Sequence, residues 1–103
     1  SMPSLVSPAA NALLTVYTPR LDWSNSTVPI GTAFDHYELQ LATDAGFTTG
    51  VITQTITGLP TVSEFTLVDP LLPNTRYYWR VRAYNTAGQY STWSTARYFR
   101  SAN

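Results

Sequence analysis

Residues 77–84 carry the feature that most constrains the fold, because apolar side chains alternate there with polar or charged ones. Only a β-strand repeats with a period of two. The side chains expected to point into a core are Tyr77, Trp79, Val81 and Ala83. Those expected to point outward are Tyr78, Arg80, Arg82 and Tyr84. We therefore predict a central strand whose outer row is aromatic and cationic.

The rest of the chain also reads as strands, since no stretch of about twelve residues repeats its apolar positions with a helical period. Further strands are predicted at 4–7, 13–16, 20–23, 35–43, 51–57, 63–68 and 93–101. The threonine-rich segment 51–57 has two similar faces, which is typical of an edge strand. Phe47 is expected to fill the edge of the core. Trp93 follows a serine-rich, bulged segment and is expected outside the core.

Length and composition bound the class of protein. The chain has 103 residues, enough for one domain that folds without metals or disulfides, and it contains no cysteine. Six arginines balance six acids, so no net charge favours nucleic acid, and no segment is apolar enough for membrane insertion. We expect a monomeric domain over 3–101, preceded by a tag remnant at 1–2 and followed by a tail at 102–103.

The segment 71–77, Leu-Leu-Pro-Asn-Thr-Arg-Tyr, leads into Arg-Val-Arg-Ala-Tyr-Asn at 80–85 and then Gly88. This order resembles the fibronectin type III signature, with Asn74 where glycine is commonest. The resemblance implies an all-β, immunoglobulin-like, two-sheet antiparallel sandwich of about seven strands with fibronectin type III topology. The core positions are then Trp23, Tyr37, Leu39, Leu71, Tyr77, Trp79, Val81 and Phe99.

The same resemblance gives two residues a local role. Tyr77 would hydrogen-bond back across the corner that precedes its strand. The segment 90–94, Tyr-Ser-Thr-Trp-Ser, is similar to the Trp-Ser-x-Trp-Ser box of cytokine receptor domains, with Tyr90 in place of the first tryptophan. It implies that Trp93 stacks between the guanidinium groups of Arg80 and Arg82.

Candidate catalytic groups are few. His36 is the only histidine, which excludes a multi-histidine metal site, and as an outward strand residue it is expected to be solvated. The six acids are dispersed along the chain, so no pair of catalytic carboxylates is predicted. Glu38 is interpreted as a cross-strand partner of Arg80 or Arg82. We therefore predict no enzyme activity, no catalytic residues, no metal and no cofactor.

The outer aromatic and arginine row is the candidate surface for a ligand or partner. Flat aromatic arrays stack on sugar rings or bind other proteins, but the arginines here can also cover the rings themselves. The surface comprises Tyr78, Arg80, Arg82, Tyr84, Tyr90, Trp93 and Tyr98.

The function expected from these features is a non-catalytic spacer or adhesion module. It would be extracellular or at the cell surface, of the bacterial surface or secreted type, and its partners would be other domains of a parent protein. The alternative is a module that binds a polysaccharide or a protein through the outer row or through the loops 24–33 and 85–89. A weaker idea is self-association through the edge strand at 51–57.

Overall fold

The computed structural model describes residues 4–7, 12–15, 17–24, 33–57, 63–67 and 70–101. These residues form β-strands, and among them no helix is long and apolar enough to cross a membrane. The strands are β1 (Leu5–Ser7), β2 (Ala12–Leu13), β3 (Arg20–Trp23), β4 (Phe34–Ala42), β5 (Ile52–Thr57), β6 (Glu64–Thr66), β7 (Arg76–Asn85) and β8 (Arg97–Arg100).

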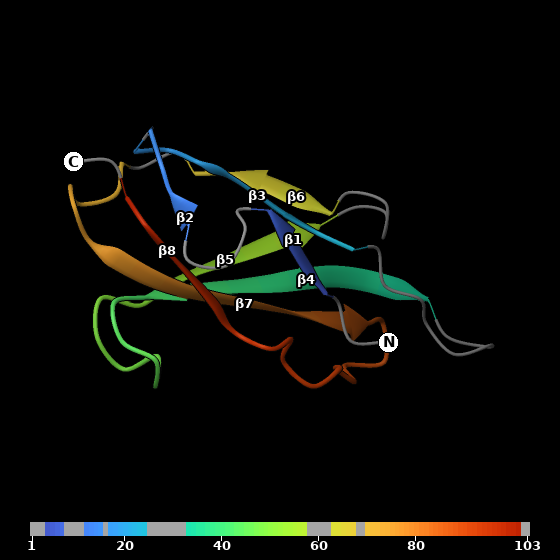
Figure 1. Ribbon diagram of the computed structural model, residues 1–103. Coiled ribbons are helices and arrows are strands. Elements are labelled where there is room, and N and C mark those ends of the chain that lie inside the picture. Colours follow the sequence, from blue (N-terminus) through green and yellow to red (C-terminus); the bar gives the residue numbers. More distant parts are fainter. Residues whose placement is uncertain are drawn as a thin grey trace.

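The strands make two sheets that pack face to face (Figure 1). The first has the order β1-β3-β6 and the second β2-β8-β7-β4-β5, so that β7 lies in the middle of the larger sheet. All described pairs are antiparallel except β2 with β8, which is parallel. The all-β sandwich predicted from the sequence is confirmed.

One face of each sheet supplies the core. Along β7 burial alternates without a break from Tyr77 to Asn85, as the sequence period requires. The rings of Trp23 and Tyr37 pack in a T-shaped arrangement with 5.3 Å between ring centres, and this contact joins the two sheets. All eight residues that the sequence assigned to the core are at most 5% exposed.

The corner before β7 is closed by Tyr77, whose hydroxyl accepts a hydrogen bond from the Leu72 amide at 3.0 Å. Asn74 takes the positive φ of 50° that this turn needs, and an asparagine adopts such an angle more easily than most residues. After β7, Gly88 has a φ of 81° in the loop that leads back toward the sheet.

Two predicted strands differ most from the observed limits. The second strand is Ala12–Leu13 rather than 13–16. The last strand is Arg97–Arg100 rather than 93–101. At residues 91–94, serine side chains make some of the hydrogen bonds to β7 that backbone carbonyls would make in a strand. The predicted tag remnant, the tail and most of the loop 24–33 lie outside the described residues.

Candidate functional site

The outer face of the larger sheet is built from alternate residues of β7 and β4. In the antiparallel register Arg80 lies opposite Gln40, and Arg82 lies opposite Glu38. Directly opposite residues in antiparallel strands point to the same face. The register therefore places two cationic side chains beside two acceptors.

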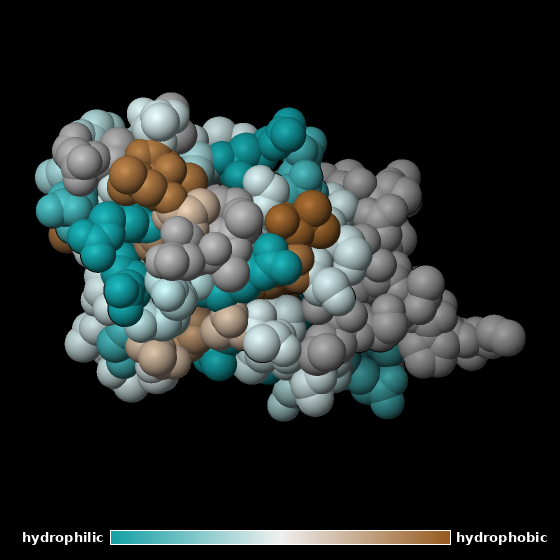
Figure 2. All heavy atoms as spheres, viewed as in Figure 1, coloured by the Kyte–Doolittle hydropathy of each residue, from teal (hydrophilic) through white to brown (hydrophobic). Residues whose placement is uncertain are grey.

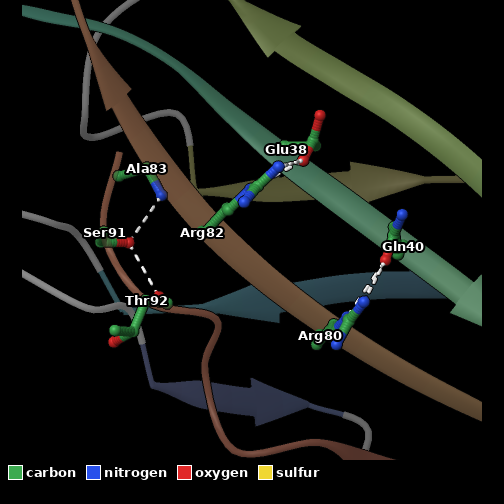
Figure 3. Close-up of polar contacts among 7 residues, drawn as sticks. All are labelled: Glu38, Gln40, Arg80, Arg82, Ala83, Ser91 and Thr92. Carbon is green, nitrogen blue, oxygen red and sulfur yellow. Dashed lines mark hydrogen bonds and ion pairs between the residues drawn. The ribbon is translucent and has the colours of Figure 1, made fainter. Parts of the chain in front are cut away.

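Each guanidinium is held by its cross-strand neighbour (Figure 3). Arg82 donates through Nε and Nη2 to Glu38 Oε1, at 2.8 and 2.7 Å. Arg80 donates in the same way to Gln40 Oε1, at 3.1 and 2.7 Å. A guanidinium is planar, so two donors on one acceptor fix the direction of its plane.

These planes stack with three aromatic rings in one continuous column. The Cζ atoms of Arg80 and Arg82 lie 4.2 and 4.3 Å from the centre of the Trp93 ring. Arg80 is also 4.1 Å from the Phe47 ring, and Arg82 is 4.4 Å from the Tyr90 ring. We call this column the ladder; its order is Phe47, Arg80, Trp93, Arg82 and Tyr90.

Two serines hold the ladder segment against β7. The Oγ of Ser94 accepts the Val81 amide at 3.0 Å, while the Ser94 amide donates to the Val81 carbonyl at 2.8 Å. Ser91 repeats both bonds with Ala83, at 3.0 and 2.9 Å, and its Oγ donates to the Thr92 carbonyl (Figure 3). Side-chain oxygens thus take the place of strand carbonyls, and Trp93 between them faces outward.

The ladder keeps a net positive charge, because Glu38 neutralises only one of its two guanidinium groups. Arg82 and Glu38 form an ion pair whose side chains are 19% and 20% exposed. Burial, followed by the positive charge of Arg82, lowers the pKa of Arg80 from its ordinary value. Cation–π contacts of this kind contribute on the order of 0.5–2 kcal/mol each, more as water is excluded. We therefore attribute to the ladder a stabilising role for the sheet.

Tyr84 of β7 packs against both the Tyr90 end of the ladder and strand β4. Its ring centre is 5.2 Å from that of Tyr90 and 4.4 Å from that of His36, with which it stacks at 14°. His36 also contacts the Asp35 carboxylate at 2.5 Å, and its side chain is only 20% exposed. The expectation of a solvated His36 was wrong, because the ring is covered by Tyr84.

The other predicted surface residues form a separate group. Tyr78 and Tyr98 face each other across β7 and β8 with ring centres 5.6 Å apart. Arg76 stacks on Tyr98 at 4.6 Å, and hydrogen bonding with Tyr78 raises the pKa of Arg76. Among the described residues no ring or cation–π contact joins this group to the ladder. The single outer row that the sequence predicted is therefore divided into two separate clusters.

Sequence reasoning missed two members of this face. Phe47 was expected at the edge of the core, but it lies on the outer face against Arg80. It has a φ of 56° and lies in the turn between β4 and β5. Gln40 was given no role by the sequence pattern, and its partnership with Arg80 follows from the strand register.

The chemistry available on this face is limited. No group of three or more histidine or acidic side chains among the described residues lies close enough to hold a metal ion. The stacking geometry also leaves Trp93 without a free face, since a guanidinium covers each side. A ring stacked on both sides has no flat surface to offer a sugar.

The fold and this face define an immunoglobulin-like, fibronectin III-like β-sandwich. Residues 9–102 match the family model of the Rha78A-like N-terminal immunoglobulin domain. The chain belongs to that family. No curated protein sequence matches it.

Three solved structures illustrate the likeness. The α-L-rhamnosidase of Streptomyces avermitilis, complexed with L-rhamnose, is 24% identical with a TM-score of 0.67, over 97% of this chain and 10% of that chain. The α-L-rhamnosidase of Dictyoglumus thermophilum is 16% identical with a TM-score of 0.70, over 90% and 11%. The fibronectin(III)-like modules of Clostridium thermocellum CbhA are 14% identical with a TM-score of 0.63, over 99% and 100%. The chain thus spans about a tenth of the length of either rhamnosidase.

Proposed function

We propose that this chain is a non-catalytic accessory module near the N-terminus of a larger glycoside hydrolase. The observation that carries the proposal is the match of residues 9–102 to a family of N-terminal domains. The match takes up almost the whole chain. Among the described residues no group of three or more histidine or acidic side chains is placed to hold a metal ion. Catalysis is therefore assigned to another domain of the parent protein.

The mechanical role of the module is that of a spacer. Strand β1 begins toward one end of the sandwich and β8 finishes at the other, so neighbouring domains could be joined in series (Figure 1). A sheet stabilised on its outer face by the ladder keeps such a spacer rigid. We infer that segment 90–94 serves this structural purpose, as its likeness to the Trp-Ser-x-Trp-Ser box also suggests.

The setting that fits this role is a secreted bacterial enzyme acting outside the cell. The fold is shared with the fibronectin(III)-like modules of CbhA and with domains of two bacterial rhamnosidases. The partners we propose are the other domains of the same polypeptide, and the substrate class of the parent would be α-L-rhamnosides. An adhesion role has no support in a particular contact of the described residues.

Carbohydrate binding by the outer face is the competing function, and the geometry disfavours it. Trp93 is covered on both sides, and Arg82 covers Tyr90 on one side. Tyr90 is 61% exposed and is the ladder ring with most freedom to meet a ligand. A single exposed ring is a small platform compared with the arrays that hold polysaccharides.

Hydrolysis of an aryl α-L-rhamnoside tests the proposal. We expect the 103-residue chain to release no aryl alcohol, and the parent protein to release it with or without residues 1–101. The control is unfolding of the shortened parent, followed by circular dichroism, to show that its remaining domains are folded. Turnover by the 103-residue chain itself, or a parent with no action on any glycoside, would contradict the proposed function.

A further inference from the structure

We propose that the end of the sandwich where β8 finishes is a docking surface for the domain that follows in the same polypeptide. We call it the exit end and define it by Leu13, Leu72, Arg76 and Arg100. The partner it fits is an apolar surface that carries carboxylates. The inference rests on the proposed function, because it requires a following domain.

Ser101, the last residue that the structure describes, lies at the exit end, and its backbone is tightly held there. The Ser101 amide donates to the Thr75 carbonyl at 2.9 Å, and the Thr75 amide donates to Ser101 Oγ at 3.0 Å. The same Oγ donates to the Leu72 carbonyl, and Ser101 is fully buried. A domain that follows Ser101 would therefore be attached at a fixed point of this end.

Two large apolar side chains are exposed at this end. Leu13 is 60% exposed and Leu72 is 64% exposed. Leu13 lies beside Arg100 in the register of β2 and β8, and the Leu72 carbonyl accepts from Ser101. Figure 2 shows an apolar patch close to β2, next to hydrophilic atoms, toward the end where β8 finishes.

Two cations stand opposite each other on the same face. Arg76 and Arg100 are directly paired across β7 and β8, an arrangement that is destabilising for like charges. Arg76 stacks on Tyr98, and Arg100 donates to Asn74 Oδ1 at 3.2 Å. Neither has an ion pair with any acid among the described residues. An acidic partner would neutralise both charges.

Apolar and charged groups side by side are typical of interfaces between domains of one chain, which are more polar than permanent subunit interfaces. The row Leu13, Arg100 and Arg76 runs across three neighbouring strands, so one flat surface can meet all of them. This end is separate from the ladder, and docking would leave the ladder uncovered.

Hydrogen–deuterium exchange on the parent protein and on the 103-residue chain tests the inference. In the parent, amides of residues 12–15 and 70–76 should exchange at least about tenfold more slowly than in the 103-residue chain. Arg100→Glu should abolish this protection in the parent. In the 103-residue chain it should preserve stability or raise it, because a like-charge pair becomes an opposite one.

Val6→Ser is the matched control, because Val6 is 54% exposed but lies on the smaller sheet. It should leave the protection of the exit end intact. Equal exchange in parent and 103-residue chain, or protection that survives Arg100→Glu, would overturn the inference. Rhamnoside hydrolysis by the same parent separates the two ideas: activity without protection removes only the docking surface, and protection without activity removes only the proposed function.

Discussion

The guanidinium carbon of Arg82 lies 4.3 Å from the centre of the Trp93 ring, and Glu38 holds that guanidinium in place from the neighbouring strand. One residue from a loop and one from the central strand are thus joined on the outer face of the sheet. Arg80 lies on the opposite side of the ring. Trp93 is therefore packed between two side chains of its own domain, although it lies outside the core.

Trp93→Ala should lower the free energy of unfolding by roughly 1–3 kcal/mol, because two cation–π contacts are lost and both guanidiniums lose a packing surface. Urea denaturation measures the change. Tyr90→Ala, which removes one arginine contact at an exposed position, is the matched variant and should cost less. An equal loss for the two substitutions would contradict the ladder as described.

Ser94→Ala should cost about 1–3 kcal/mol, because it leaves the buried Val81 amide without its side-chain acceptor. The exposed Thr95 offers a control, and Thr95→Ala should change stability by less than about 0.5 kcal/mol. Thermal unfolding followed by circular dichroism compares the two. If Ser94→Ala unfolds at the wild-type temperature, the serine is not acting as a strand carbonyl.

Tyr77→Phe should cost on the order of 1 kcal/mol, since only the hydroxyl that accepts the Leu72 amide is removed. The ring stays in the core against Phe99, with 6.1 Å between ring centres. Chemical denaturation measures the shift, with Tyr90→Phe as the control at an exposed position. An unchanged midpoint for Tyr77→Phe would remove the corner hydrogen bond from the account.

Asp44 should stay ionised in acid well beyond an ordinary aspartate. Its carboxylate accepts the side-chain hydroxyl and the amide of Thr48, at 2.7 and 2.8 Å, and the corresponding groups of Thr49, at 3.1 and 2.9 Å. These bonds, the Thr48 hydroxyl first, hold the pKa of Asp44 far below its usual range.

The sign of the effect on stability follows from that direction. A lowered folded-state pKa stabilises the protein above the unfolded-state value of about 3.9 and loses this effect as the pH falls through the folded-state pKa. The stability advantage of wild type over Asp44→Asn should therefore shrink as the pH falls below about 4. Carbon NMR of the carboxyl group measures the titration directly, and a midpoint near the ordinary value would be inconsistent with the four hydrogen bonds.

The main strands could be predicted from the sequence because their residue types alternate strongly and most of their inward side chains are large and apolar. Along β7, and along residues 36–41 of β4, partly exposed and buried positions alternate, so burial leaves one arrangement. Trp93 was expected outside the core and between two arginines, and the structure has it there. This prediction was based on the likeness of residues 90–94 to the Trp-Ser-x-Trp-Ser box.

The remaining features depend on backbone angles and register that the residue pattern does not contain. Phe47, with a φ of 56° in the turn between β4 and β5, lies against Arg80 instead of at the edge of the core. The last strand is short because the side chains of Ser91 and Ser94 accept hydrogen bonds from β7. The alternation of residue types shows at most a bulge there and does not reveal these bonds. The opposition of Arg76 and Arg100 appears only when the two strands are aligned.

The most direct test of the central claim, that the aromatic and arginine face stabilises an accessory module instead of binding sugar, is affinity electrophoresis. Wild type, Tyr90→Ala and Trp93→Ala would be run through gels that contain different soluble polysaccharides, with circular dichroism to show that each is folded. We predict that all three migrate with the same relative mobility in every gel. Retardation of the wild type that is lost in a folded Tyr90→Ala or Trp93→Ala variant would contradict the account and identify the face as a carbohydrate-binding site.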